Sequence, residues 1–85
     1  MIFLLDYDRA SGSLVTIREF DDAMRAHAEQ SRLALELDNL QRGVGREVVL
    51  LEAATLGDLR RTHRRYFESI DSLTTGPHSV LSDAA

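Results

Sequence analysis

The stretch IFLLDYDRASGSLVTIREF, residues 2–20, decides the fold. Its first half begins with an apolar run, and its second half contains the β-branched residues Val15, Thr16 and Ile17, which favour strands. Residues 9–12 lie between the two halves and end in a glycine, which adopts positive φ without steric cost. The stretch therefore predicts a β-hairpin.

A long helix is expected directly after the hairpin. Asp21 or Asp22 offers an N-cap, because a carboxylate there accepts hydrogen bonds from the first free backbone amides. Gly43 and Gly45 follow Arg42, and glycine is the usual residue just beyond a helix C-terminus. The helix is therefore predicted to run from the aspartate pair to Arg42.

This predicted helix has one broad apolar face and one charged face when its residues are placed at intervals of about 100°. The apolar face, expected to lie in the core, carries Ala23, Ala26, Leu33, Ala34, Leu37 and Leu40. The opposite face, expected to lie in water, carries Arg25, Glu29, Arg32 and Glu36. A smaller cluster, about a third of a turn from the main stripe, consists of Met24, Ala28 and Leu35. This cluster either widens the core face or contacts a partner.

A third strand and a second helix follow. Residues 46–53 contain four consecutive apolar residues without polar alternation, which is typical of a strand buried on both faces. Thr55 and Asp58 have the spacing of a capping box that opens a helix. At helical spacing, one stripe of this segment carries Leu56, Leu59, His63, Tyr66, Phe67 and Ile70.

The rest of the chain is rich in small and polar residues, and Gly76-Pro77 would break any continuing element. We therefore predict a single domain of residues 1–71 and a flexible C-terminal tail of residues 72–85.

The predicted order of elements is ββαβα, and the fold class is α+β. The expected architecture is a two-layer sandwich in which two helices cover one face of a three-stranded, mainly antiparallel sheet. A helical crossover makes the second and third strands run in the same direction, so placing the first strand between them makes every neighbouring pair antiparallel. The predicted strand order is 2-1-3, and direct pairing of the second and third strands is the alternative.

Two helices on one face would leave the other face of the sheet open. Alternate residues of the first strand would then form an exposed apolar patch there. A second copy of the chain, stacked on this face, would cover the patch. We therefore expect a homodimer, and the candidate contact residues are Phe3, Leu5, Tyr7, Met24 and Leu35.

Four arginines of the second helix form a basic flank beside its apolar stripe: Arg60, Arg61, Arg64 and Arg65. Such a flank can bind the phosphates of a nucleic acid or the acidic face of a protein partner. It can equally be a solvated face whose arginines pair with carboxylates of the same chain. Of the two binding roles, we favour binding to an acidic protein partner over binding to nucleic acid.

Asp6, Asp8 and His63 are the other residues whose side chains could carry chemistry. The two aspartates share one side of the first strand, where they could hold a cation or act in acid/base catalysis, but aspartates near a hairpin bend usually bond local amides. A histidine on an apolar helix stripe is most often a packed residue. The sequence therefore assigns no catalytic residue, no cofactor site and no metal ligand.

Composition limits the remaining classes. The chain has 85 residues, a formal net charge of −4 and no cysteine, which excludes disulfides and thiolate sites. No apolar run approaches the roughly 20 residues of a membrane-spanning helix, and the N-terminal sequence lacks the pattern of a signal peptide. We expect a cytoplasmic protein without membrane contact.

Three functions are consistent with the sequence. The favoured one is a small non-enzymatic protein-interaction or regulatory module that acts as a homodimer. The first alternative is a nucleic-acid-binding regulatory protein that uses the arginine flank. The second is a small enzyme or ligand binder with a cleft between two copies near Asp6, Tyr7, Asp8 and His63.

Overall fold

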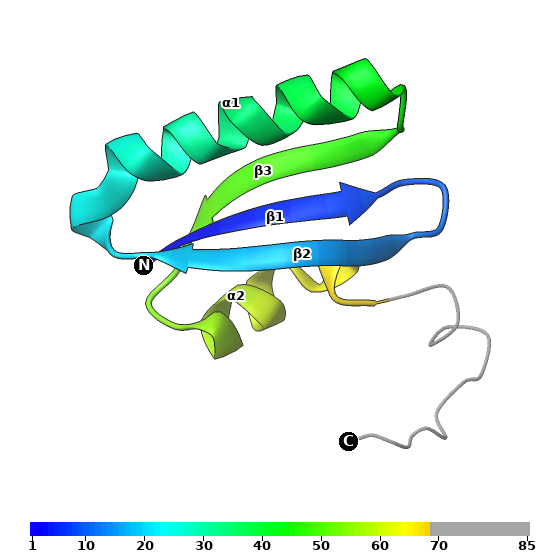
Figure 1. Cartoon of the computed structure of the whole chain (residues 1–85). Coiled ribbons are helices and arrows are strands. Elements are labelled where there is room, and N and C mark those ends of the chain that lie inside the picture. The colour runs from blue at the N-terminus through cyan, green and yellow to red at the C-terminus, as the bar shows by residue number, and fades with distance from the viewer. Residues whose placement is uncertain (69–85) are drawn as a thin grey trace.

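The computed structural model describes residues 1–68, so the predicted tail of residues 72–85 lies outside the described residues. Residues 1–68 form a three-stranded sheet with one long and one short helix, arranged as in Figure 1. The elements in chain order are β1 (Ile2–Asp8), β2 (Ser13–Phe20), the 3-10 turn η1 (Asp22–Met24), α1 (Arg25–Arg42), β3 (Arg46–Glu52), α2 (Leu56–Thr62) and the 3-10 turn η2 (Arg64–Tyr66).

The sheet confirms the predicted class and strand order. Its order is β2-β1-β3, and β1 is antiparallel to both neighbours. Ile2 of the central strand lies opposite Phe20 on one side and Glu52 on the other. The apolar run at the start of β1 is at most 2% exposed, as expected for the strand with neighbours on both edges.

Glycine ends two elements where the sequence predicts it. Gly12 closes the hairpin with φ of 68°, and Gly43 follows α1 with φ of 67°. The Gly43 amide donates to the carbonyls of Asn39 and Leu40, a left-handed C-cap. The start of α1 differs from the expectation, because the amide of Met24 donates to the backbone carbonyl of Asp21 rather than to its carboxylate.

The two helices cover opposite faces of the sheet rather than one face (Figure 1). Ile2 and Leu4 pack under α1, whereas Phe3 and Leu5 pack with Leu59 of α2. Handedness constrains only a helix between two parallel strands, which describes α1 but not α2. Because α2 follows the last strand, it is free to cover the apolar face that α1 leaves open.

The core consequently has two halves separated by the sheet. The α1 half consists of Ile2, Leu4, Phe20 and Ala28, with Leu35, Val48 and Leu50 against them. The α2 half is built on Phe3, Leu5, Leu59 and Tyr66. Both faces of the sheet are therefore covered by elements of the same chain, and the predicted open face for a stacked second sheet is filled.

The buried face of α1 is not the predicted one. Its buried residues are Ala28 and Asn39, and the half-buried ones are Ser31, Arg32, Leu35 and Glu36. All members of the predicted core stripe are exposed: Ala23, Ala26, Leu33, Ala34, Leu37 and Leu40. The small side chain of Ala28 allows close approach to the sheet, and Asn39 reaches the buried Asp6, so these contacts fix the rotation of the helix.

The second helix is shorter than predicted. Thr55 caps α2 by accepting a hydrogen bond from the Asp58 amide (3.1 Å), as expected. The helix ends at Thr62, whose hydroxyl donates to the Asp58 carbonyl (3.0 Å), a contact that competes with helical bonding. His63 then adopts φ of −126° and ψ of 55°, and this bend directs η2 back towards the sheet.

Candidate functional site

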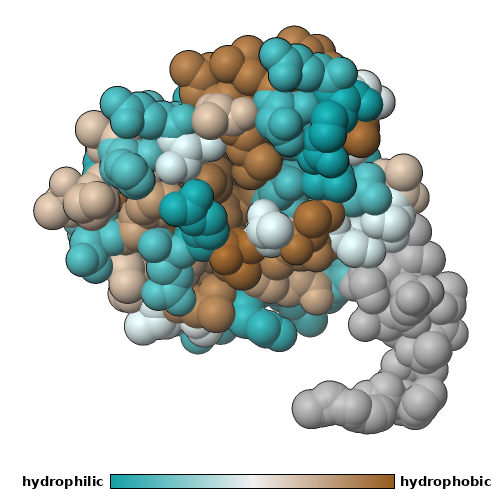
Figure 2. Space-filling view, in the orientation of Figure 1, coloured by the Kyte–Doolittle hydropathy of each residue, from teal (hydrophilic) through white to brown (hydrophobic). Residues whose placement is uncertain are grey.

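The outer side of α1 carries the largest apolar side chains that face solvent. Leu33, Leu37 and Leu40, which we call the leucine row, are 54%, 50% and 75% exposed. Figure 2 shows this hydrophobic surface along the top of the molecule, where Figure 1 places α1. Large exposed apolar patches on small domains are often interaction surfaces, so the leucine row is a candidate for one.

The spacing of the leucine row is that of helix-to-helix packing. Its members are four and then three residues apart, and Ala26 continues the row seven residues before Leu33. This alternation keeps a seam on one side of a helix, as in coiled coils. Sequence reasoning found these residues but assigned them to the core, because periodicity alone does not say which of two apolar faces is buried.

A charged flank runs along α1 on the side of β3, and we call Arg25, Glu29, Arg32 and Glu36 the charged row. Arg25 Nη2 bonds Glu52 Oε2 of β3 at 2.7 Å. Arg32 Nη1 bonds Glu36 Oε1 at 2.9 Å along the helix. Arg25 is exposed, and the hydrogen bond that it donates to Glu52 raises its pKa. Its charge is therefore permanent at any physiological pH.

A groove of about 470 Å³ separates this flank from β3. Ile2 and residues 48–52 line one wall, and Arg25, Glu29 and Arg32 line the other. A second groove of about 280 Å³ lies at the other end of β3, where Leu40 and Val44 meet Val48. Leu40 of the leucine row thus borders a groove that reaches β3.

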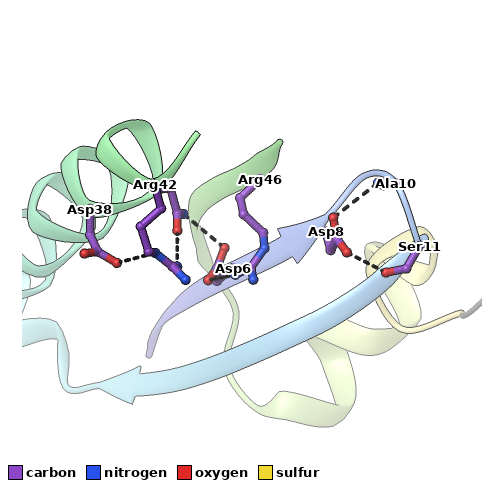
Figure 3. A network of polar contacts seen from close by, with 8 residues as sticks. Asp6, Asp8, Ala10, Ser11, Asp38, Arg42 and Arg46 are labelled. Atoms are coloured by element: carbon purple, nitrogen blue, oxygen red, sulfur yellow. Dashed lines mark hydrogen bonds and ion pairs between the residues drawn. The ribbon is translucent and has the colours of Figure 1, made fainter. Parts of the chain in front are cut away.

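Asp6 is buried in a polar network, which Figure 3 shows between β1, β3 and α1. Arg46 Nη1 donates to Asp6 Oδ2 at 2.8 Å, and Asn39 Nδ2 donates to Asp6 Oδ1 at 3.4 Å. Arg42 in turn donates to Asn39 Oδ1 at 3.0 Å and pairs with Asp38 at 3.0 Å. Both oxygens of Asp6 are therefore occupied by structural partners.

Asp8 lies on the same strand but has separate partners, which point towards the hairpin loop in Figure 3. Its carboxylate accepts from the Ala10 amide (3.3 Å) and the Ser11 hydroxyl (2.9 Å). The turn role predicted for an aspartate at this place is confirmed. Asp6 and Asp8 do not converge on a common point.

The arginine flank is engaged within the chain. Arg61 bonds Asp58 at 2.6 Å, and Arg64 lies 3.9 Å from Glu68. Arg60 stacks over Phe67 with 5.2 Å to the ring centroid. These contacts favour a solvated, internally paired face over a phosphate-binding one.

Arg65 belongs to a cluster that fastens η2 to the sheet. It donates to Glu47 Oε2 at 2.7 Å and stacks over the Tyr66 ring at 4.2 Å, while the Tyr66 hydroxyl donates to the same Glu47 oxygen at 2.6 Å. The hydrogen bond from Tyr66 and the pairing with Arg65 hold the pKa of Glu47 below its ordinary value. Burial and the bond to Glu47 raise the pKa of Tyr66.

The remaining candidate residues are dispersed. Phe3 and Leu5 are fully buried beneath α2, and Tyr7 packs edge-to-face on Tyr66. Leu35 packs on the α1 half of the core, whereas Met24 is exposed. Of these five candidate contact residues, only Met24 is an exposed apolar side chain.

His63 bonds the Thr62 hydroxyl through Nδ1 at 2.9 Å and does not approach Asp6, whose side chain lies on the other face of the sheet. Within residues 1–68, no three His, Asp or Glu side chains gather where they could hold a metal ion. In the same range, neither helix is both long and apolar enough to cross a bilayer. Asp6 lies on the α1 side of the sheet and Tyr7 on the α2 side, so these side chains do not gather in one copy of the described chain, and the cleft expected between two copies stays a prediction.

Comparison with protein-family models, with curated proteins and with solved structures finds no match to this chain.

Proposed function

We propose that the protein is a small non-enzymatic interaction module that works as a homodimer. The observation that carries this proposal is the leucine row of α1, three large apolar side chains that are each at least half exposed. Fully burying one leucine contributes about 1.5 to 3 kcal/mol. A second polypeptide that buries the leucine row therefore gains hydrophobic free energy of association, because these side chains are not buried in the monomer.

A second copy is the partner that fits this surface. Isologous contacts require one patch to be complementary to itself, and a seam with alternating spacing packs well against an identical seam. The small size of the domain adds to the argument, since a single core of this size rarely supplies more than about 3 to 5 kcal/mol. Association adds buried area that the chain alone lacks.

The non-enzymatic part of the proposal rests on the occupied polar groups. Asp6 is held by Arg46 and Asn39, Asp8 by the hairpin turn, and His63 by the Thr62 hydroxyl. Each candidate acid or base thus has a structural partner. These contacts support a role in binding over a role in catalysis.

The proposal is tested by molar mass in solution. We expect light scattering to give twice the chain mass of 9.5 kDa at protein concentrations of tens of micromolar. The double variant Leu33→Glu/Leu40→Glu should give the mass of one chain, because each charge replaces an exposed apolar contact. Its circular dichroism should match the parent, since both positions lie outside the core.

The matched control is Gln41→Glu, which adds a charge to the next residue of α1, also exposed but about 100° around the helix from Leu40. It should remain a dimer. A monomeric parent protein under these conditions would overturn the proposal, and so would a leucine double variant that dimerises as tightly as the parent.

A further inference from the structure

Among residues 1–68, no strand pairs with the outer edge of β3, and the positions of its outward backbone groups follow from the ladder. The Ala53 amide donates to the Met1 carbonyl at 3.2 Å, and the Arg9 amide donates to the Gly45 carbonyl at 3.3 Å. Hydrogen-bonded pairs alternate along an antiparallel ladder, so with this register Val49 bonds β1. Val48 and Leu50 therefore direct their amides and carbonyls away from the sheet.

The middle of this edge, residues 48–51, lacks the features that discourage pairing with another strand, because the charged residues of β3 lie at its two ends. Proteins protect edge strands with charges, bulges or proline. β2, the other edge, has Arg18 and Glu19 and a register shift opposite Asp6 and Tyr7. In contrast, β3 has four apolar residues between Glu47 and Glu52 and an even register with β1.

We infer that two copies pair antiparallel along their β3 edges, with the two-fold axis at Val49. This inference rests on the proposed self-association and adds a contact between copies on β3 and the charged row, distinct from the leucine row on the outer side of α1. Val48 then exchanges hydrogen bonds with Leu50 of the second copy, so the unpaired groups of both edges are satisfied. The same register places Arg46 opposite Glu52 of the second copy, a pairing of opposite charges at each end of the ladder.

The charged row of α1 supports this arrangement independently of β3. In a continuous six-stranded sheet the two α1 helices lie side by side and antiparallel on one face. From Arg25 to Glu36 the charges of the row alternate, beginning with a positive one. The partner helix runs in the opposite direction, so its row begins with a negative charge. Arg25 then faces Glu36 of the second copy and Glu29 faces its Arg32. Every charge of the row meets an opposite charge.

The helix and the strand agree on where the axis passes. The bond between Arg25 and Glu52 places the start of α1 beside the end of β3. The middle of the charged row is about 8 Å along the helix from Arg25 at 1.5 Å per residue. Val49 is about 10 Å along the strand from Glu52 at 3.3 Å per residue. The same two-fold axis therefore passes through the middle of the β3 ladder and through the middle of the charged row.

Space for the second copy is present. The groove of about 470 Å³ between the charged row and β3 opens towards the edge that would be paired. Long arginine and glutamate side chains from the second copy fit such a groove. Their aliphatic parts then pack on Val48 and Leu50, and their charged ends reach the charged row. Leu40, at the end of α1, then approaches the start of α1 in the second copy.

Cysteine cross-linking tests the register, because the chain has no cysteine of its own. In the inferred pairing, Val49 lies directly opposite its own copy in a non-hydrogen-bonded pair, with Cα atoms about 4.5 Å apart, which a disulfide can bridge. Val49→Cys should therefore form a disulfide-linked dimer on mild oxidation.

Leu51→Cys is the matched control for that variant. Leu51 is half-buried in the same half of the core, but in the inferred pairing its copy lies about 13 Å away along the strand. It should remain uncross-linked under the same oxidation. Equal cross-linking of the two variants, or cross-linking of Leu51→Cys alone, overturns the inferred register.

A charge exchange tests the helix pair and does not depend on the folding of the cysteine variants. Glu29→Arg places like charges opposite each other twice per dimer and should raise the dissociation constant about tenfold. The double variant Glu29→Arg/Arg32→Glu restores opposite charges across the axis and should recover most of that affinity. A double variant that binds no better than the single variant contradicts the antiparallel helix pair.

The outcomes separate this inference from the proposed function. If the parent protein is monomeric, both fail. If it is a dimer that Val49→Cys does not cross-link and that the charge exchange does not affect, the homodimer stands and the β3 pairing is wrong.

Discussion

Glu47 is the residue at which three parts of the chain meet. It lies on β3, its carboxylate accepts from Tyr66 and Arg65 of η2, and Arg9 of the hairpin loop lies 3.8 Å away. Hydrogen bonds to a charged group are stronger than neutral ones. The single carboxylate thus fixes both the loop and η2 against the sheet.

Tyr66→Phe removes one of these bonds without changing the shape of the ring. Because the bond is to a charged acceptor and Tyr66 is buried, the free energy of unfolding at neutral pH should fall by about 1.5 to 3 kcal/mol. Urea denaturation at pH 7 measures this loss. A change within experimental error would show that water replaces the hydroxyl at no cost.

The same bond predicts a pH dependence. The lowered pKa of Glu47 contributes stability that is complete above its ordinary value of 4.5 and is lost as the pH falls through the folded-state pKa. The raised pKa of Tyr66 contributes stability that is complete below 10.0 and is lost as the pH rises through its folded-state value. The difference in unfolding free energy between the parent and Tyr66→Phe should therefore be largest between these limits and shrink beyond each of them.

At the scale of elements, α1 shows what sequence can and cannot specify. Its end at Arg42 is predicted from Gly43, because a left-handed residue requires glycine locally. Its buried face is not predictable from periodicity, since the helix has apolar residues on two sides. Asn39 selects the side by reaching Asp6 across 33 residues of sequence, and no local pattern encodes that contact.

The same distinction applies to the other elements. The hairpin, β3 and the Thr55 cap follow from local signals, and the strand order follows from the crossover. The face chosen by α2 depends on which apolar side of β1 remains uncovered, a property of the assembled sheet. The position of β3 at the edge of the sheet follows from the predicted strand order, but the groove between β3 and α1 becomes visible only in the structure.

Gly43→Ala tests the C-cap of α1. The added methyl group meets nothing within 4 Å, so its cost is the strain of φ at +67° alone, about 1 kcal/mol. Gly45→Ala is the control, because that position also has open space and its φ is not positive. Thermal unfolding should show a lower midpoint for Gly43→Ala and an unchanged or higher one for Gly45→Ala. Equal midpoints would mean that the left-handed conformation carries no cost here.

At the scale of the whole molecule, β1 is enclosed by a strand on each edge and a helix on each face. The α2 side depends on one fully buried residue of the short helix, Leu59, which packs on Phe3 and Leu5. Seven residues of helix have little stability of their own. This packing is therefore what holds α2 on the sheet.

Leu59→Ala should lower the free energy of unfolding by about 2 to 5 kcal/mol, from lost apolar contact and the cavity left behind. Val15→Ala, at an exposed position of β2 away from both helices, should cost less than about 1 kcal/mol. Chemical denaturation of the two variants measures the difference. Similar losses would show that α2 is not anchored through Leu59.

The charges and the irregular register of β2 also decide how far an assembly of this protein can grow. The inferred pairing through β3 would use the apolar edge of each copy, so the resulting dimer would have β2 at both ends of its sheet. Arg18 and Glu19 on those outer strands, with the register shift beside them, oppose the addition of another strand. Under the inferred β3 pairing, growth of the sheet would therefore stop at two copies.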